Sequence, residues 1–123
     1  MADAIVLIDD LFFQAKLHQT AKLTGVALET VATGEQLVKS AAASPSALII
    51  VDLNARQGAL EAVEQLGALG NSGNAGNPRR VIAFLSHVQT ELAERARAAG
   101  CQEVMPRSQF TQNLAAILRG AKS

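Results

Sequence analysis

Three of the four aspartates in this 123-residue chain directly follow short apolar runs, and their carboxylates are the groups best placed to do chemistry. Asp9 and Asp10 end the run "IVLIDD", and Asp52 ends the run "ALIIVD". If the two runs are neighbouring parallel strands, their carboxyl ends meet at one edge of the sheet. Open α/β sheets bind their ligands at that edge. The spacing therefore predicts a shared acidic pocket.

Three carboxylates in one pocket repel one another. At an effective dielectric constant near 20, two like charges at about 4 Å cost on the order of 4 kcal/mol. The pocket must therefore hold a proton, a divalent cation or a basic side chain. Magnesium suits such a site, because it needs only one or two carboxylates and completes its shell with water.

Asp9 and Asp10 also have a purely structural interpretation, in which they end a strand and begin a helix. Aspartate favours turns and helix N-termini, because its side chain accepts hydrogen bonds from the backbone and its charge complements the helix dipole. For Asp9 and Asp10 taken alone, both interpretations stay open. The similar ending at Asp52 is what favours a shared pocket.

Continuous apolar runs without polar alternation are typical of parallel strands that are covered on both faces. The runs that predict strands are residues 4–8, 47–51 and 81–85, with weaker ones at 26–32 and 102–106. Apolar residues at helical spacing predict the intervening helices at residues 11–24, 33–43, 59–69 and 88–99, and a last one from residue 108 onward.

Several helix ends have readable signals. Gly25 is typical of a residue that stops a helix. Thr33 followed by Gln36 is a capping-box pattern. Ser108 is predicted to cap the N-terminus of the last helix.

Strands alternating with helices predict an α/β fold, a flavodoxin-like doubly wound parallel sheet of five strands with helices on both faces. We expect one domain, residues 1–123. The segment "GNSGNAGN" (residues 70–77) follows a helix and lacks a Gly-Lys-Ser/Thr ending, so we interpret it as a surface connection rather than a phosphate-binding loop.

The composition narrows the class of function. Eleven basic and eleven acidic residues give zero formal charge, which argues against a nucleic-acid partner. No apolar run is long enough to span a membrane, and Cys101, the one cysteine, cannot form a disulfide framework or a cysteine metal site. We expect a cytoplasmic domain.

The runs "IVLIDD" and "LIIVDL", together with "HVQTELAERARAAGCQEVMPRSQF", resemble the receiver domain of bacterial two-component response regulators. The resemblance covers nearly the whole chain and implies the chemotaxis-regulator-like strand order 2-1-3-4-5. It implies that Asp52 accepts a phosphoryl group. It also implies that Asp10, Asp52 and the backbone carbonyl of Asn54 hold Mg²⁺, with Asp9 acting through water.

Other positions depart from the pattern of these receivers. Leu85 stands at the place of a Thr or Ser and cannot hydrogen-bond a phosphoryl oxygen, and Ser86 beside it can do so only through a one-residue slip. Val104 stands at the place of the switch aromatic residue. Arg107 stands at the place of a lysine, and its planar fork can pair bidentately with Asp52.

Three functions are open at this point. The first is an atypical, non-enzymatic receiver that acts through protein–protein contact, with weakened or lost phosphorylation switching and possible dimerisation through its fourth helix, fifth strand and fifth helix. The second is a working receiver, in which Asp52 takes phosphate from a histidine kinase and Arg107 replaces the lysine. The third, more remote, is a flavodoxin-like binder of small ligands or a small enzyme.

Overall fold

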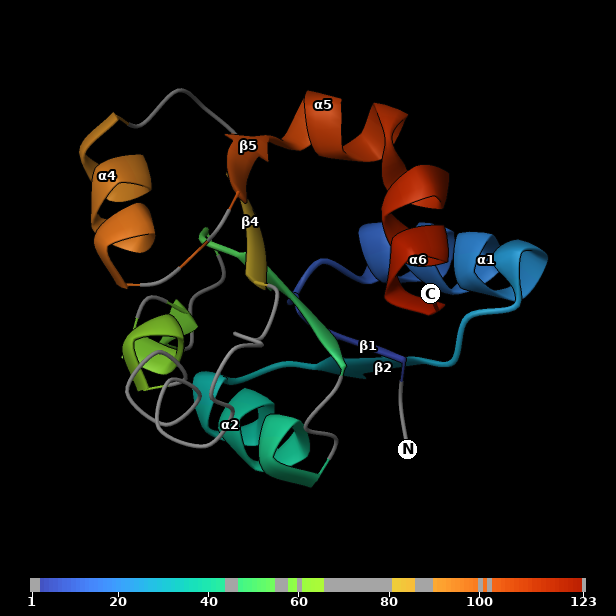
Figure 1. The fold of residues 1–123 in the computed structure, drawn as a ribbon, viewed down its shortest axis with the longest axis horizontal. Helices are drawn as coiled ribbons and strands as arrows, with labels where there is room; N and C mark the ends of the chain where they lie inside the picture. The colour runs from blue at the N-terminus through green and yellow to red at the C-terminus, as the bar shows by residue number, and fades with distance from the viewer. Residues whose placement is uncertain are drawn as a thin grey trace.

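Five parallel strands form the centre of the molecule, in the order β2-β1-β3-β4-β5 (Figure 1). The computed structural model describes residues 3–43, 47–54, 58–59, 61–65, 81–85, 90–99, 101 and 103–122. The strands are β1 (Ala4–Leu7), β2 (Leu28–Val31), β3 (Leu48–Asp52), β4 (Val81–Leu85) and β5 (Glu103–Pro106). The predicted α/β class, strand order and parallel pairing are confirmed.

The helices lie where the sequence predicts them, with small differences at their ends. They are α1 (Leu11–Thr24), α2 (Gly34–Ala43), α4 (Thr90–Ala99), α5 (Arg107–Gln112) and α6 (Leu114–Lys122). In the predicted helix 59–69, residues 59 and 61–65 are helical. The rest of that prediction lies outside the described residues, as do the segment 70–77, residues 88–89 and residue 102. No helix in the described ranges is long and apolar enough to cross a membrane.

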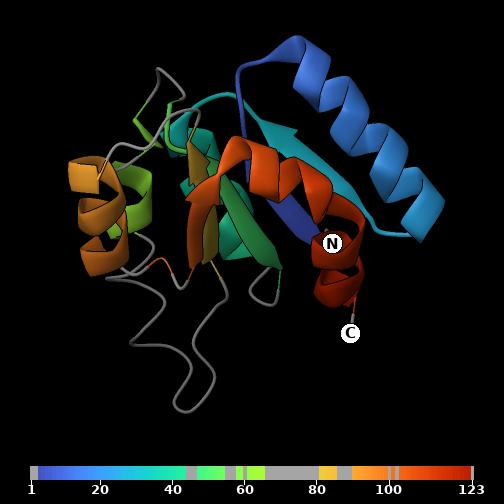
Figure 2. The ribbon, with the colours of Figure 1, turned by 90° about the horizontal axis from the view of Figure 1, so that it is seen from above.

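Helices cover both faces of the sheet, which explains why the strands are apolar throughout. Successive side chains of a strand point to opposite faces. Val6 and Ile50 pack with α1, α5 and α6, whereas Leu7 and Val51 pack with α2, α4 and the helical residues 61–65. Figure 2 shows these two layers, with α1, α5 and α6 on one side of the sheet and α4 on the other.

Two of the predicted helix ends are confirmed. Gly25 ends α1 in the left-handed conformation, with φ of 74°, and its N–H bonds back to the last turn. At the start of α2, Gln36 N donates to Thr33 Oγ1 at 3.2 Å. Gln36 Oε1 accepts from Ala32 N at 3.1 Å, so the reciprocal bond of the capping box reaches one residue further back than usual.

The prediction that Ser108 caps the last helix is wrong. That helix begins one residue earlier, at Arg107, and Pro106 stands at the cap without a side-chain bond. Proline has a fixed φ, here −63°, and ends β5 directly at the helix start. The helix is also interrupted at Asn113, whose side chain donates to the backbone oxygen of Gln109 at 3.0 Å and competes with regular helix bonding.

The strand register brings the carboxyl ends of the central strands together. Leu7 pairs with Val51, so Asp9 and Asp10 leave β1 beside the end of β3. Asp52 stands opposite Phe84, and Leu85 stands opposite Pro106, the residue before Arg107. The residues predicted to form the pocket therefore leave neighbouring strands at one edge of the sheet.

Candidate functional site

Asp52 is the deepest of the three carboxylates at this edge. It is 5% exposed, the only buried charged residue in the described part of the chain. Its Oδ1 accepts a hydrogen bond from Asn54 N at 2.9 Å. Burial raises the pKa of Asp52, and the charges of Asp9 and Asp10 raise it further, while the Asn54 bond and the charge of Arg107 lower it. The result is a carboxyl group whose ionised form is disfavoured.

Asp10 is the N-cap of α1. Its backbone is extended, and its Oδ1 accepts from Phe12 N at 3.0 Å and from Phe13 N at 3.2 Å. These bonds satisfy two of the N–H groups that a helix start leaves without partners. The structural interpretation, which the sequence left open, therefore applies to Asp10.

Arg107 takes the other oxygen of Asp10. Its Nη2 donates to Asp10 Oδ2 at 2.6 Å, and about one third of each side chain is exposed. This bond is the main cause that lowers the pKa of Asp10, and the two backbone donors of α1 add to it. Asp10 is thus an ionised group whose two oxygens are both occupied.

Arg107 could by its chemistry pair bidentately with Asp52, but its one ion pair in the described part of the chain is the single contact with Asp10. The reason is accessibility: Asp10 stands at the half-exposed start of α1, whereas Asp52 is buried in the sheet. The charge of Arg107 still lowers the pKa of Asp52, so it compensates the pocket without touching its deepest member.

An aromatic cluster supports this arginine. The guanidinium carbon lies 4.3 Å from the centre of the Phe13 ring, within the range of a cation–π contact. Phe13 meets Phe84 and Phe110 edge to face at 5.5 and 5.9 Å, and those two rings stack at 4.5 Å. Sequence reasoning missed this cluster, because its members come from α1, β4 and α5 and show no local pattern.

The other predicted site residues differ in their surroundings. Asp9 is exposed at the rim. Leu85 is 3% exposed and belongs to the apolar core beneath α4, where Val104 packs against the same core. Ser86 lies outside the described residues, so its possible slip is not described either. Leu85 and Val104 therefore contribute packing at this edge and offer no polar atom.

The donors suit magnesium in kind but not in this arrangement. Carboxylate and carbonyl oxygens are its usual ligands. Among the described residues, however, no three His, Cys, Asp or Glu side chains come together as a metal site. Oδ2 of Asp10 is engaged by Arg107, and the positive charge of the guanidinium beside it opposes a cation at that atom. Cys101 offers no alternative chemistry, because burial raises the pKa of its thiol to about 11.

We expect Arg107→Ala to lower the free energy of unfolding near neutral pH, by at least the value of the lost cation–π contact, about 0.5–1 kcal/mol. The variant loses a solvent-screened, charge-assisted bond to Asp10 and a cation–π contact of about 0.5–1 kcal/mol. Urea denaturation measures the change. Arg107→Lys is the control, because it keeps the charge and should lose less.

The pair between Arg107 and Asp10 makes the free energy of unfolding depend on pH. The folded-state pKa of Asp10 lies below its ordinary value of 3.8, so the stabilisation is present above that value and is lost as the pH falls through the folded pKa. The difference in free energy of unfolding between wild type and Arg107→Ala, measured by urea denaturation, should therefore shrink in strong acid. A difference that stays constant from neutral to acid pH would mean that the pair does not stabilise the fold.

Asp52→Asn should stabilise the domain at neutral pH by on the order of 1 kcal/mol. The folded pKa of Asp52 is raised, so ionisation opposes folding above that pKa and the penalty disappears toward the ordinary value of 3.8. Thermal unfolding at pH 7.5 and pH 4 should show a higher Tm for the variant only at pH 7.5. Glu64→Gln, at an exposed position, is the control. Equal stability at pH 7.5 would contradict the account.

Solved structures similar to this chain are receiver domains. The receiver domain in the co-crystal structure of the Saccharomyces cerevisiae proteins Ypd1 and Ssk1 matches with a TM-score of 0.77 and 15% identity, over 97% of this chain and 89% of that chain. FixJ-N matches with a TM-score of 0.75 and 21% identity, over 99% of this chain and 96% of that chain. The signal receiver domain of the response regulator NarL from Mycobacterium tuberculosis matches with a TM-score of 0.72 and 18% identity, over 98% of this chain and 95% of that chain.

No protein-family profile and no curated protein sequence matches the chain. The identities to the solved structures are low, so the likeness is one of architecture. This likeness agrees with the strand order β2-β1-β3-β4-β5. This chain has the flavodoxin-like fold of response regulator receiver domains.

Proposed function

We propose that this single domain, residues 1–123, is an atypical receiver, a non-enzymatic cytoplasmic signalling module that acts through protein–protein contact and responds weakly to phosphorylation. The observation that carries the proposal is the 2.6 Å pair between Arg107 and Asp10. The acidic pocket of this chain supplies its own cation from β5–α5. Charge compensation, which a metal would otherwise provide, is already present in the resting domain.

The surroundings of the pocket support a weak switch. A ligand shifts a conformational equilibrium only by its differential affinity for the two states. A phosphoryl group on Asp52 gains no hydroxyl contact from Leu85, and Val104 supplies no ring that could report it. Losing one charge-assisted hydrogen bond of about 1.5–3 kcal/mol removes most of a typical allosteric bias of about 1–3 kcal/mol.

A working receiver is the second candidate, and one observation favours it. The charge of Arg107 acts on Asp52 without an ion pair between them, so it can also act on a phosphoryl group carried there. In this version a histidine kinase or a related phosphotransfer protein supplies the phosphate, as the complex of the Ssk1 receiver with a histidine phosphotransfer protein suggests by analogy. Asp10, Asp52 and the Asn54 carbonyl would then hold Mg²⁺, with Asp9 acting through water, after Arg107 has turned away.

An amide NMR titration, first with Mg²⁺ and then with beryllofluoride, separates the two candidates. We expect small shifts confined to the loops after β1 and β3, because the contacts that would carry a change further are missing. Large shifts that reach β5 and α4, and that Asp52→Asn abolishes, would show a full switch and overturn the proposal of a weakened one.

The arginine gives this titration an internal check. Arg107→Ala frees Asp10 Oδ2 and should raise the affinity for Mg²⁺ several-fold. Arg97→Ala removes a positive charge of the same kind from α4 and should leave that affinity unchanged. Equal affinities in wild type and Arg107→Ala would mean that the pair with Asp10 does not compete with the metal.

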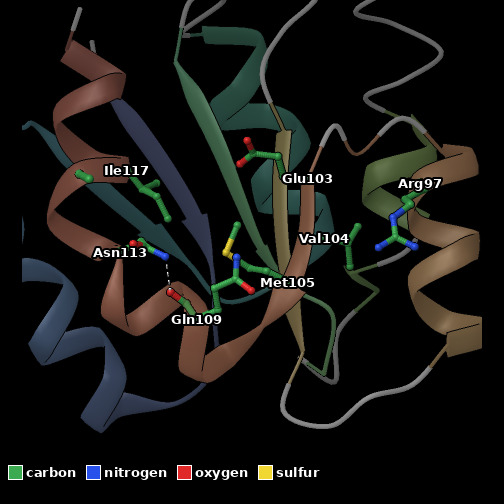
Figure 3. A pocket seen from close by; sticks show the side chains of 8 residues that line it. Arg97, Glu103, Val104, Met105, Gln109, Asn113 and Ile117 are labelled. Atoms are coloured by element: carbon green, nitrogen blue, oxygen red, sulfur yellow. Dashed lines mark hydrogen bonds between the residues drawn. The ribbon is translucent and has the colours of Figure 1, made fainter.

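A homodimer through α4, β5 and α5 is a further part of this proposal. A groove of about 570 Å³ lies between these elements and α6 (Figure 3). Its lining mixes charges and apolar groups: Arg97, Glu103, Val104, Met105, Gln109, Asn113, Ala116 and Ile117. In a two-fold contact, Arg97 of one copy can meet Glu103 of the other, because a closed dimer uses the same patch twice.

We expect a weak dimer whose population rises with concentration and falls several-fold in Arg97→Glu. Sedimentation velocity over a concentration series measures it. Combining Arg97→Glu with Glu103→Arg restores opposite charges and should restore association. Lys39→Glu, on the exposed side of α2, is the matched control. A strict monomer at high concentration would remove this part of the proposal.

A further inference from the structure

The helices on one face of the sheet carry basic residues and no acidic ones. This layer consists of α1, α5 and α6, which lie together on one side in Figure 2. The residues 11–24 and 107–122 contain no Asp or Glu, and their basic residues are Lys16, Lys22, Arg107, Arg119 and Lys122. The whole chain has zero net charge, so the rest of it is acidic by the same amount. The molecule is therefore electrically polarised, with its positive side on this layer.

Acidic residues adjoin this layer at the ends of α1. Asp9 and Asp10 precede the helix, and Asp10 is already bonded to the start of α5. Asp3 lies beyond the other end, where it accepts a hydrogen bond from Ala27 N at 3.0 Å. The exposed basic side chains on the helices themselves are Lys16, Lys22 and Arg119. The surface between the two ends of α1 is thus of one sign.

The exposed large apolar side chains of the described residues project from the same layer. Leu11 is 76% exposed, Phe12 is 93% exposed and Leu23 is 80% exposed. A single exposed apolar residue needs no explanation on a soluble protein, but three on one helix form a concentrated surface. The opposite side of α1 is buried against the sheet, so the helix lies flat and directs these side chains outward.

Basic residues lie on both sides of the apolar line on α1. Each residue turns a helix by about 100°, so Phe12 and Leu23 point in nearly the same direction, about 16 Å apart. By the same rotation, Lys22 lies to one side of that line and Lys16 to the other. The neighbouring helix α6 packs against α1 and adds Arg119. Apolar side chains flanked by Lys and Arg are typical of a helix that lies in a membrane interface.

The breadth and the sign of this surface favour lipid over one protein partner. An anionic bilayer is an extended plane, so positive charges on two neighbouring helices can act on it at the same time. The long stems of lysine and arginine can lie along apolar groups while their charges stay at the phosphates. A second copy of the chain would instead bring like charges together.

We propose that the outward surface of α1 and α6 binds reversibly to an anionic lipid surface. The exposed apolar side chains of α1 insert at the boundary between head groups and acyl chains, and the exposed basic side chains meet the lipid phosphates. The residues involved are Leu11, Phe12, Lys16, Lys22, Leu23 and Arg119. The inference goes beyond the proposed function, because the contact needs no phosphate on Asp52 and uses neither the acidic pocket nor the groove beside β5.

Co-sedimentation with lipid vesicles tests the charge requirement. Vesicles of phosphatidylcholine mixed with phosphatidylglycerol should bind the protein at least about tenfold more tightly than vesicles of phosphatidylcholine alone. Added salt should weaken this binding, because it screens the attraction between exposed charges. Equal binding to both kinds of vesicle, or binding to neither, would overturn the inference.

A single introduced fluorophore tests insertion, because the chain contains no tryptophan. Phe12→Trp keeps an aromatic side chain at the most exposed of the three apolar positions. Its fluorescence should move to shorter wavelength when phosphatidylglycerol vesicles are added. Lys39→Trp, at an exposed position of α2, is the control and should show no such change. Binding without a change at Phe12→Trp would mean adsorption by charge alone and would contradict insertion.

Exposed substitutions test the surface without disturbing the core. Phe12→Ser and Leu23→Ser should each weaken vesicle binding about tenfold, since each removes one apolar side chain that the lipid buries. Lys16→Glu combined with Lys22→Glu should weaken it by at least about tenfold. Lys39→Glu makes the same change of charge on the opposite layer and should leave the affinity unchanged. Affinity that is unaffected by Phe12→Ser would refute the assignment to α1.

Two further outcomes would assign the surface to another occupant and overturn the inference. Concentration-dependent shifts of α1 amide resonances without lipid would assign it to a second copy of the chain. Binding of a soluble acidic amphipathic peptide, without binding of vesicles, would assign it to a protein. The beryllofluoride titration is carried out without lipid, so the proposed function can stand or fall separately.

Discussion

The two oxygens of Asp10 hold the functional edge of this molecule together. Oδ1 caps α1 through Phe12 and Phe13, and Oδ2 binds Arg107 at the start of α5. One side chain therefore connects the β1–α1 junction with the β5–α5 junction, 97 positions further along the chain. Phe13 adds a second connection, because it lies under the guanidinium and against the rings of Phe84 and Phe110.

This constraint explains the charges of the pocket. Asp52 is almost completely buried, next to the charges of Asp9 and Asp10. A buried carboxylate in such surroundings needs compensation, and Arg107 supplies it from a position where it is itself stacked and hydrogen-bonded. A lysine would carry the same charge, but it lacks the planar group that can lie on Phe13 and bind Asp10 at once. The arginine therefore makes two contacts at this pocket that a lysine could not make together.

The sequence predicts the local features of this structure well. Apolar runs, Gly25 and the Thr33–Gln36 pair act over a few residues, so strands and helix ends follow from them. The strand order is what the resemblance to receiver domains implies, and the structure confirms it. It also places the aspartates at one edge of the sheet. The partner of Arg107 could not be predicted, because whether the guanidinium reaches Asp10 or Asp52 depends on how far α5 is offset from α1. The error at Ser108 has a local cause, since Pro106 stands at the cap and the helix already begins at Arg107.

The connections of Asp10 also show which elements meet at the pocket. Asp10 directly precedes Leu11 and Phe12, so any event that draws Arg107 away from Oδ2 acts on the cap of α1. The groove beside β5 is joined to the same pair, because Arg107 directly follows β5 and begins α5, whose Gln109 lines the groove. Leu85 and Val104 pack in the apolar core and their side chains offer no polar atom. Coupling between two sites requires an element that both of them bias. In this chain the pair between Arg107 and Asp10 joins the capped start of α1 to the start of α5, so it is the described contact through which a change in the pocket would reach either helix.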